Sequence, residues 1–281
     1  MATPEVGIRE GLSYEEYDAN DCVTGGFLFT MMEKSPAHAM ADKLGDGDTT
    51  EALTFGSAFH TAILEPEALE DRYVAKPHGM SFATREGKAW RAEQSREIIT
   101  ADQWNDLLGM RDAVYSDSLA GSILHQDGLR EASVFWQEQS TYGKSIGAEP
   151  IWCKGRPDFI PEGMLVDLKT TLDARPRAFS RQADTLGYWT KMSFYQHGLE
   201  LAGGKRPREV FLIAIEKVKP YAINVFLVPT ETLNTGRTYM EAALFRFREC
   251  RDSGVWPAFG GAIHPIVLPP WRIEMVYGGR A

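Results

Sequence analysis

The sequence predicts an α/β fold (α+β in its mixed sheet), in which a central mixed sheet is flanked by helices and follows a helical N-terminal portion. Two observations predict it. Residues 1–125 carry mostly helical patterns, whereas strand-like runs begin near residue 126 and then mix with helices. This order is typical of a sheet covered by helices. Because the 281 residues are 43% hydrophobic and contain no low-complexity linker, we expect residues 1–281 to form a single domain, with its sheet in residues 126–281.

The N-terminal helices are recognised by apolar side chains at helical spacing. The segments with this pattern are residues 27–43, 53–64 and 100–119. Pro36 interrupts the first of them, because proline ends or kinks a helix. His60 sits just beside the apolar stripe of the second. Thr100 opens the third as an N-cap, with Gln103 three residues later, which is the pattern of a capping box.

The strands are recognised by short apolar runs bounded by turn residues. The predicted strands are residues 132–137, 150–160, 163–170, 209–216 and 222–228. The turn at residues 161–163 (Pro-Glu-Gly) is suited to a hairpin between the second and third. A polar stretch with several arginines follows residue 170, and helices are expected at residues 188–201 and 230–251. The proline-rich tail is expected to be irregular.

Composition excludes several classes of protein. The net charge of −9 and the pI of about 5.3 argue weakly against a nucleic-acid partner, although a carboxylate-rich metal site would itself add negative charge. Cys22, Cys153 and Cys250 are scattered and odd in number, so a zinc cluster or a disulfide framework is not expected. The sequence shows no secretory signal and no apolar run that could cross a bilayer. We therefore expect no membrane association and a cytoplasmic protein.

The pattern D-x8-D-x-K, formed by Asp158, Asp167 and Lys169, is the sharpest chemical feature. Side chains alternate along a strand, so Asp167 and Lys169 should share one face while Val166 and Leu168 face the other way. The hairpin should bring Asp158 alongside Asp167. A lone D-x-K is usually a solvated charge pair, but the apolar flanks predict a buried strand, where charges are rare unless they are paired or bind a metal.

Two carboxylates and an ammonium on one patch suit metal-dependent phosphodiester hydrolysis. Hard divalent cations such as Mg²⁺ prefer carboxylate oxygens. Such an ion lowers the pKa of a bound water and neutralises charge in the transition state. Asp158 and Asp167 are the predicted metal ligands, and the carbonyl of Leu168 could also reach the ion. Lys169 could bind either the attacking water or the scissile phosphate.

The segment that carries Asp158, Asp167 and Lys169 resembles the core of the PD-(D/E)XK nuclease superfamily, in its RecB-like branch. The chain as a whole resembles the exonuclease VIII type of phage and prophage recombination nuclease (the RecE C-terminal nuclease domain). The segments that carry the likeness are residues 34–37, 55–60, 64–67, 155–158, 166–171, 194–195 and 255–257. The combination of G-x3-H, R-P-D and D-x-K-T-T is specific, whereas each piece alone is weak. The resemblance implies that His60 is a further metal ligand on a helix.

The resemblance also implies an activity and partners. It implies a 5′→3′ exodeoxyribonuclease that degrades one strand of linear double-stranded DNA to mononucleotides and leaves a 3′ overhang for recombination. It implies two Mg²⁺ ions per site, and an imidazole ligand would allow Mn²⁺ as well. The implied partners are a single-strand annealing protein of the RecT/Bet type and further copies of the chain, in a ring-shaped tetramer. The implied setting is the cytoplasm of a bacterial host of a phage or prophage.

One position departs from the family pattern. RecB-like nucleases often carry Q-x3-Y on the helix after the D-x-K strand, whereas this chain has the pattern Lys191-x3-Tyr195, with a lysine where the glutamine is expected. The two side chains still share a helix face. A lysine can attract a phosphate but cannot accept a hydrogen bond, so the role of the glutamine is not carried over. Tyr195 fits a catalytic role and core packing equally well.

The remaining candidates are charged residues near these strands. Glu131 could be a third carboxylate ligand, but its place at the start of a strand favours a strand-edge charge. The predicted DNA-backbone contacts are Arg156, Thr170, Arg177, Arg181 and Lys191. Each of these could equally belong to a solvated charged face. None would read the base sequence, which suits an exonuclease.

Two other functions stay open. The first is a RecB-like nuclease that acts on single-stranded DNA or flaps. Such relatives often hold an iron–sulfur cluster with four cysteines, and the three scattered cysteines argue against that version. The second is a catalytically inactive DNA-end-binding protein on the same fold, which the lysine at position 191 favours and the complete D…D-x-K pattern opposes.

Overall fold

The computed structural model describes residues 4–45, 51–139 and 149–277. Its central feature is a five-stranded sheet in the order β10-β9-β8-β7-β4. The bounds of these strands are β4 Gly128–Arg130, β7 Phe159–Pro161, β8 Met164–Thr171, β9 Glu209–Glu216 and β10 Ile223–Leu227. β8 and β9 are parallel, and the other neighbouring pairs are antiparallel. The sheet is therefore mixed, and the predicted fold class is confirmed.

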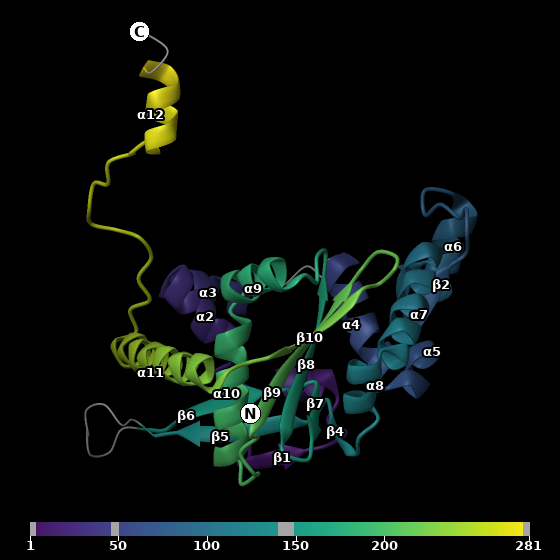
Figure 1. Cartoon of the computed structure of the whole chain (residues 1–281), viewed down its shortest axis with the longest axis horizontal. Helices are drawn as coiled ribbons and strands as arrows, with labels where there is room; N and C mark the ends of the chain where they lie inside the picture. The colour runs from purple at the N-terminus through teal and green to yellow at the C-terminus, as the bar shows by residue number, and fades with distance from the viewer. Residues whose placement is uncertain (1–3, 46–50, 140–148, 278–281) are drawn as a thin grey trace.

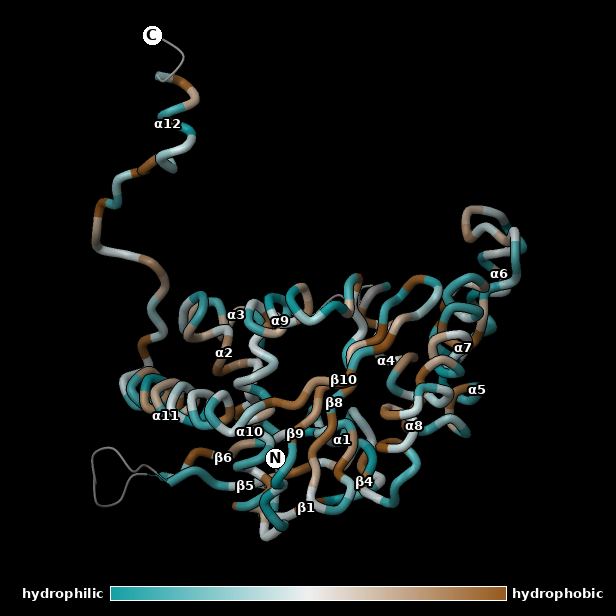
Figure 2. Tube along the Cα trace, viewed as in Figure 1, coloured by the Kyte–Doolittle hydropathy of each residue, from teal (hydrophilic) through white to brown (hydrophobic). Residues whose placement is uncertain are grey.

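Helices cover both faces of this sheet (Figure 1). One face packs against α10 (Tyr188–Leu201), which in turn packs against α2 (Gly25–Glu33) and α11 (Thr230–Ser253), and buried side chains of these elements form one hydrophobic core. The other face packs against α4 (Glu51–Leu64), α7 (Ala101–Ser116) and α8 (Ser118–Leu124), and forms a second core. The hydrophobic residues follow β8 and β9 between the two layers (Figure 2).

Shorter elements complete the fold. A three-stranded sheet, in the order β1-β5-β6, lies beside α10, and a parallel pair joins β2 to β3. The bounds of these strands are β1 Gly7–Arg9, β2 Tyr73–Lys76, β3 Glu97–Thr100, β5 Ser133–Glu138 and β6 Ile151–Gly155. The remaining helices are α1 Tyr14–Asp18, α3 Pro36–Leu44, α5 Leu69–Arg72, α6 Arg85–Glu93, α9 Pro176–Thr185 and α12 Pro270–Tyr277, with a 3₁₀ turn at Pro66–Ala68.

Most predicted elements are confirmed. Pro36 is the first residue of α3, so the predicted interruption is the boundary between two helices. Thr100 and Gln103 form both hydrogen bonds of the predicted capping box at the start of α7. None of the helices within the described ranges is long and apolar enough to cross a membrane.

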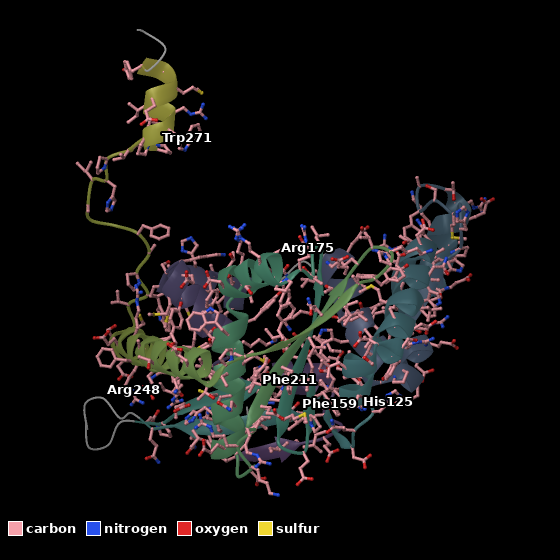
Figure 3. All side chains as sticks on the ribbon, in the orientation of Figure 1. His125, Phe159, Arg175, Phe211, Arg248 and Trp271 are labelled. Atoms are coloured by element: carbon pink, nitrogen blue, oxygen red, sulfur yellow. The ribbon has the colours of Figure 1, made fainter. Side chains whose placement is uncertain are left out.

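Two predictions about elements are wrong, and one helix was not predicted. The strand expected at residues 150–160 is two strands, β6 and β7, which belong to different sheets and are separated by Arg156-Pro157-Asp158. The polar stretch after residue 170 contains α9, which begins at Pro176. The tail contains α12, which begins at Pro270, a residue that is tolerated in the first turn of a helix. α12 stands clear of the rest of the fold, and Trp271 lies on it (Figures 1 and 3).

Candidate metal centre

The β7–β8 hairpin positions the D-x8-D-x-K residues. Gly163 makes the turn with a φ of 76°, in the left-handed region that favours glycine. Phe159 pairs with Val166, so Asp158 lies opposite Asp167, as predicted. One carboxylate oxygen of Asp158, Oδ2, accepts a hydrogen bond of 2.6 Å from the backbone N–H of Leu168. The hairpin thus holds Asp158 against the strand that carries Asp167 and Lys169.

The predicted alternation along β8 is also present. Val166 and Leu168 belong to the core under α4 and α7. Asp167 lies on the opposite side, where its Oδ1 is 3.5 Å from Nζ of Lys191 on α10. The ammonium of Lys169 contacts Oδ2 of Asp167 and donates to the carbonyl oxygen of Leu168 over 3.1 Å. Both predicted ligand oxygens on this strand are therefore in contact with the same lysine.

A second group converges on Asp158 from two other elements. Nδ1 of His60, on α4, is 3.5 Å from Oδ1 of Asp158 and 3.5 Å from Oε1 of Glu131. Ligand atoms of His60, Glu131 and Asp158 all lie within 4.8 Å of one another. Among the described residues, this is the one group of three histidine, cysteine or acidic side chains that could hold a metal ion.

The interpretation of Glu131 as a strand-edge charge is wrong. Its side chain is only 19% exposed and points at His60 and at Arg156. Its backbone adopts a φ of 48°, and its N–H donates to the carbonyl oxygen of Asp158. A positive φ is uncommon for a residue other than glycine, and no spacing rule in the sequence signals it. Because Glu131 and Asp158 are far apart in the sequence, their contact could not be predicted.

The electrostatic setting keeps Asp158 ionised. Burial favours its neutral form, but His60 and Lys169, together with the Leu168 amide, hold the pKa of the Asp158 carboxyl below its ordinary value. Burial, with the nearby charge of Lys191, lowers the pKa of the Lys169 ammonium to about 7. The site therefore presents a carboxylate ready to ligate a cation beside an amine that can exchange a proton near neutral pH.

Tyr195 lies in the hydrophobic core and also reaches the site, so core packing and a role in the site are compatible. The residue is 7% exposed and belongs to the hydrophobic core between the sheet and α10. Its hydroxyl takes part in hydrogen bonds with Lys191 and with the backbone of Arg156. Burial raises the pKa of Tyr195. Tyr195 therefore helps to fix the positions of Lys191 and of the Arg156-Pro157-Asp158 segment.

The predicted DNA contacts fall into three places, which are the metal centre, α9 and β8. Arg156 lies in the site, where Nε donates to Oε2 of Glu131 over 3.2 Å and the buried Nη1 makes no hydrogen bond within the described part of the chain. Arg177 and Arg181 are exposed on α9, one helical turn apart. Thr170 is half-buried on β8. Arg175, labelled in Figure 3 beside α9, is instead paired with Asp173.

The donor set fits a hard divalent cation. One imidazole and two carboxylates supply nitrogen and oxygen ligands, which suit Mg²⁺ or Mn²⁺ better than a soft metal. Oδ1 of the fully buried Asp167 accepts no hydrogen bond from the described residues. A buried carboxylate oxygen without a donor is costly, and additional positive charge nearby would relieve it.

Comparison with known proteins identifies the fold. A family model described as a PDDEXK-like domain of unknown function (DUF3799) matches residues 28–266. The solved structure of a presumed exonuclease from Eubacterium rectale is similar, with a TM-score of 0.61 at 15% identity over 96% of this chain and 98% of that chain. A phage-related exonuclease from Haemophilus somnus 129PT gives 0.34 at 12% identity over 83% of this chain and 96% of that one. No curated protein matches the sequence.

Proposed function

Because the chain belongs to the family of PDDEXK-like domains of unknown function, we propose that it is a divalent-metal-dependent 5′→3′ exodeoxyribonuclease that acts on linear double-stranded DNA. The observation that carries this proposal is the group of His60, Glu131 and Asp158 beside the ammonium of Lys169. PDDEXK nucleases use divalent metals, and a nuclease needs both the cation and a nearby proton donor or acceptor. The 5′ polarity and the 3′ overhang rest on the resemblance to exonuclease VIII.

Each residue of the site has a defined task in this proposal. His60, Glu131 and Asp158 would hold Mg²⁺, with Asp167 beside them in the hairpin as the further predicted ligand. The bound ion would supply an acidified water and neutralise charge on the phosphate. Lys169 would orient the water or the scissile phosphate by hydrogen bonding.

The DNA backbone would be held by arginines outside the metal centre. Arg177 and Arg181 are exposed and have no ion-pair partner among the described residues, so they are free to bind phosphates. Such contacts are independent of base sequence, as an exonuclease requires. An overhang left by the enzyme would be the substrate of a single-strand annealing protein of the RecT/Bet type.

The polarity is tested with two linear duplexes, one labelled at a single 5′ end and one at a single 3′ end. With Mg²⁺, we expect early release of labelled mononucleotide from the first and late release from the second. Early release of label from a single strand or flap, with little release from the blunt duplex, would favour the single-strand nuclease instead. Tight binding to DNA ends without any product would favour the inactive end-binding protein.

Glycine at position 155 is expected to be required for the position of Tyr195. A Cβ atom at Gly155 would lie 2.7 Å from two carbons of the Tyr195 ring. Gly155→Ala must therefore displace the ring and the Lys191 ammonium bonded to it, and a shift of this size should lower DNA hydrolysis by about a hundredfold. Hydrolysis rates and urea unfolding are measured together. Gly26→Ala is the control, since a Cβ there meets only Thr24 Oγ1 at 4.0 Å, and equal rates for the two variants would refute the packing role.

Self-association is proposed from the C-terminal arm, defined as residues 260–277. The arm carries exposed large hydrophobic side chains: Ile263, Ile266, Val267, Leu268, Trp271, Ile273, Met275, Val276 and Tyr277. Contiguous exposed apolar side chains are typical of protein–protein contacts. We propose that a second copy of the chain covers it, in keeping with the ring-shaped assembly that the resemblance implies.

This association is tested by light scattering after size-exclusion chromatography. We expect the wild type to be oligomeric and Trp271→Glu to shift it toward monomer, because a buried charge opposes the apolar contact. Glu274→Gln, on the same helix, removes a charge and should leave the oligomer intact. A monomeric wild type, or an oligomer that Trp271→Glu leaves unchanged, would contradict the role of the arm.

A further inference from the structure

Asp167 is enclosed between two ammonium groups. It is completely buried, its Oδ2 contacts Nζ of Lys169, and its Oδ1 lies 3.5 Å from Nζ of Lys191. Oδ1 makes no hydrogen bond within the described residues, so Lys191 acts on it by charge rather than by a formed hydrogen bond. In a site with two metal ions, a carboxylate in this place would use its two oxygens for two cations. Here each oxygen faces a lysine.

Lys191 is held in place from the protein side. It lies on α10, one turn before Tyr195, and is hydrogen-bonded to the Tyr195 hydroxyl. Its Nζ is 5.2 Å from the centroid of the Tyr195 ring, within the range of a cation–π contact. Its side chain is 35% exposed, whereas that of Asp167 is not exposed at all. The ammonium therefore contacts a buried carboxylate on one side and remains accessible to a substrate on the other.

The formal charges of the site support a single divalent ion. The site holds three carboxylates and three cations. Glu131 is paired with Arg156, Asp167 is paired with Lys169 and Lys191, and Asp158 lies beside Glu131 and His60. These charges cancel when both lysines are protonated. One divalent ion adds the two positive charges that a phosphodiester and a hydroxide nucleophile would balance. A second ion would leave two positive charges uncompensated in a largely buried site, which is costly.

We propose that Lys191 takes the place of a second metal ion, so that the site binds one divalent cation, at His60, Glu131 and Asp158. This inference rests on the proposed nuclease function and revises the two ions that the family resemblance implies. Lys191 then supplies, as a fixed ammonium beside Asp167, the second positive charge for the phosphate. Lys191 would therefore act on the substrate and would also determine the metal stoichiometry.

A merely structural lysine would have a different effect. If Lys191 only offset the buried charge of Asp167, its removal would destabilise the fold without changing how many ions bind. If it replaces an ion, removal of its charge frees Oδ1 of Asp167 for a cation. The two roles are therefore separated by counting bound ions, a readout that does not depend on catalysis.

The test counts Mn²⁺ per chain by electron paramagnetic resonance of the free ion, in the whole protein without DNA. We expect the count to rise from about one in the wild type to about two in Lys191→Gln. Lys191→Arg keeps the charge and should keep one ion, and Lys205→Gln, which alters an exposed lysine, is the matched control. Thermal unfolding of each variant verifies that it is folded. If Lys191→Gln does not fold, Lys191→Met provides the same charge removal.

The outcomes separate this inference from the proposed function. Two ions in the wild type, or one ion in a folded Lys191→Gln variant, would overturn the replacement of an ion by Lys191. No ion in the wild type would instead remove the metal site on which the proposed function rests. One ion in a wild type that cleaves no DNA would reject the nuclease activity while leaving the stoichiometry as inferred.

Discussion

Replacing Asp158 by asparagine should lower DNA hydrolysis by about a thousandfold or more, because the loss of a bound cation removes several kcal/mol of transition-state stabilisation and each 1.36 kcal/mol is about tenfold in rate. Asp158 contacts both the His60 imidazole and the strand that carries Asp167 and Lys169. Its Oδ1 faces His60 and its Oδ2 accepts from the Leu168 amide. Asparagine has the same shape and can still accept that hydrogen bond, so the hairpin should stay folded while the ion is lost.

The measurement is the rate of nucleotide release from linear DNA at saturating Mg²⁺, together with Mn²⁺ affinity. Asp184→Asn is the matched control, since Asp184 is an exposed carboxylate on α9. It should retain the wild-type rate. A folded Asp158→Asn variant that binds Mn²⁺ and hydrolyses DNA like the wild type would show that the cation site has been misplaced.

Replacing Lys169 by alanine should lower hydrolysis by about a hundred- to a thousandfold, which is the size of effect seen when one positioned donor is removed from an active site, while the ion at His60, Glu131 and Asp158 stays bound. Lys169 is not a ligand of the group formed by His60, Glu131 and Asp158. Its ammonium instead contacts the oxygens of Asp167 and Leu168. Activity and ion binding should therefore separate in this variant.

The rate of DNA hydrolysis and the affinity for Mn²⁺ are measured on one preparation, with Lys88→Ala as a control at an exposed lysine. The pair of variants is more informative than either alone, because Asp158→Asn should lose both properties and Lys169→Ala only one. A Lys169→Ala variant that loses Mn²⁺ binding would mean that this lysine orders the ligands. A Lys169→Ala variant that keeps the wild-type rate would show that Lys169 takes no part in the reaction.

The part of the site built by local geometry could be predicted from the sequence. A hairpin turn at Gly163 and the two-residue period of β8 are enough to place Asp158 opposite Asp167 and to separate Asp167 from Val166 and Leu168. The capping box at Thr100 and the helix boundary at Pro36 depend on neighbouring residues only, and both are confirmed. The family match at residues 28–266 agrees with the fold class expected from these patterns.

The parts that depend on distant contacts could not be predicted. Glu131 reaches the site through a left-handed backbone conformation and a hydrogen bond to the carbonyl of Asp158, neither of which leaves a sequence pattern. The run at residues 150–160 is apolar at both ends, which favoured a single strand, whereas the structure divides it between two sheets at Arg156-Pro157-Asp158. The contact of Lys191 with Asp167 likewise depends on how α10 packs against β8.

We propose that this chain hydrolyses DNA with a divalent cation. The direct measurement is release of acid-soluble label from uniformly labelled linear duplex by wild-type protein, first in excess chelator and then after addition of Mg²⁺ or Mn²⁺. The structure predicts no release in chelator and rapid release once either ion is added, because His60, Glu131 and Asp158 suit both ions. Undiminished release in chelator, or none with either ion, would contradict it.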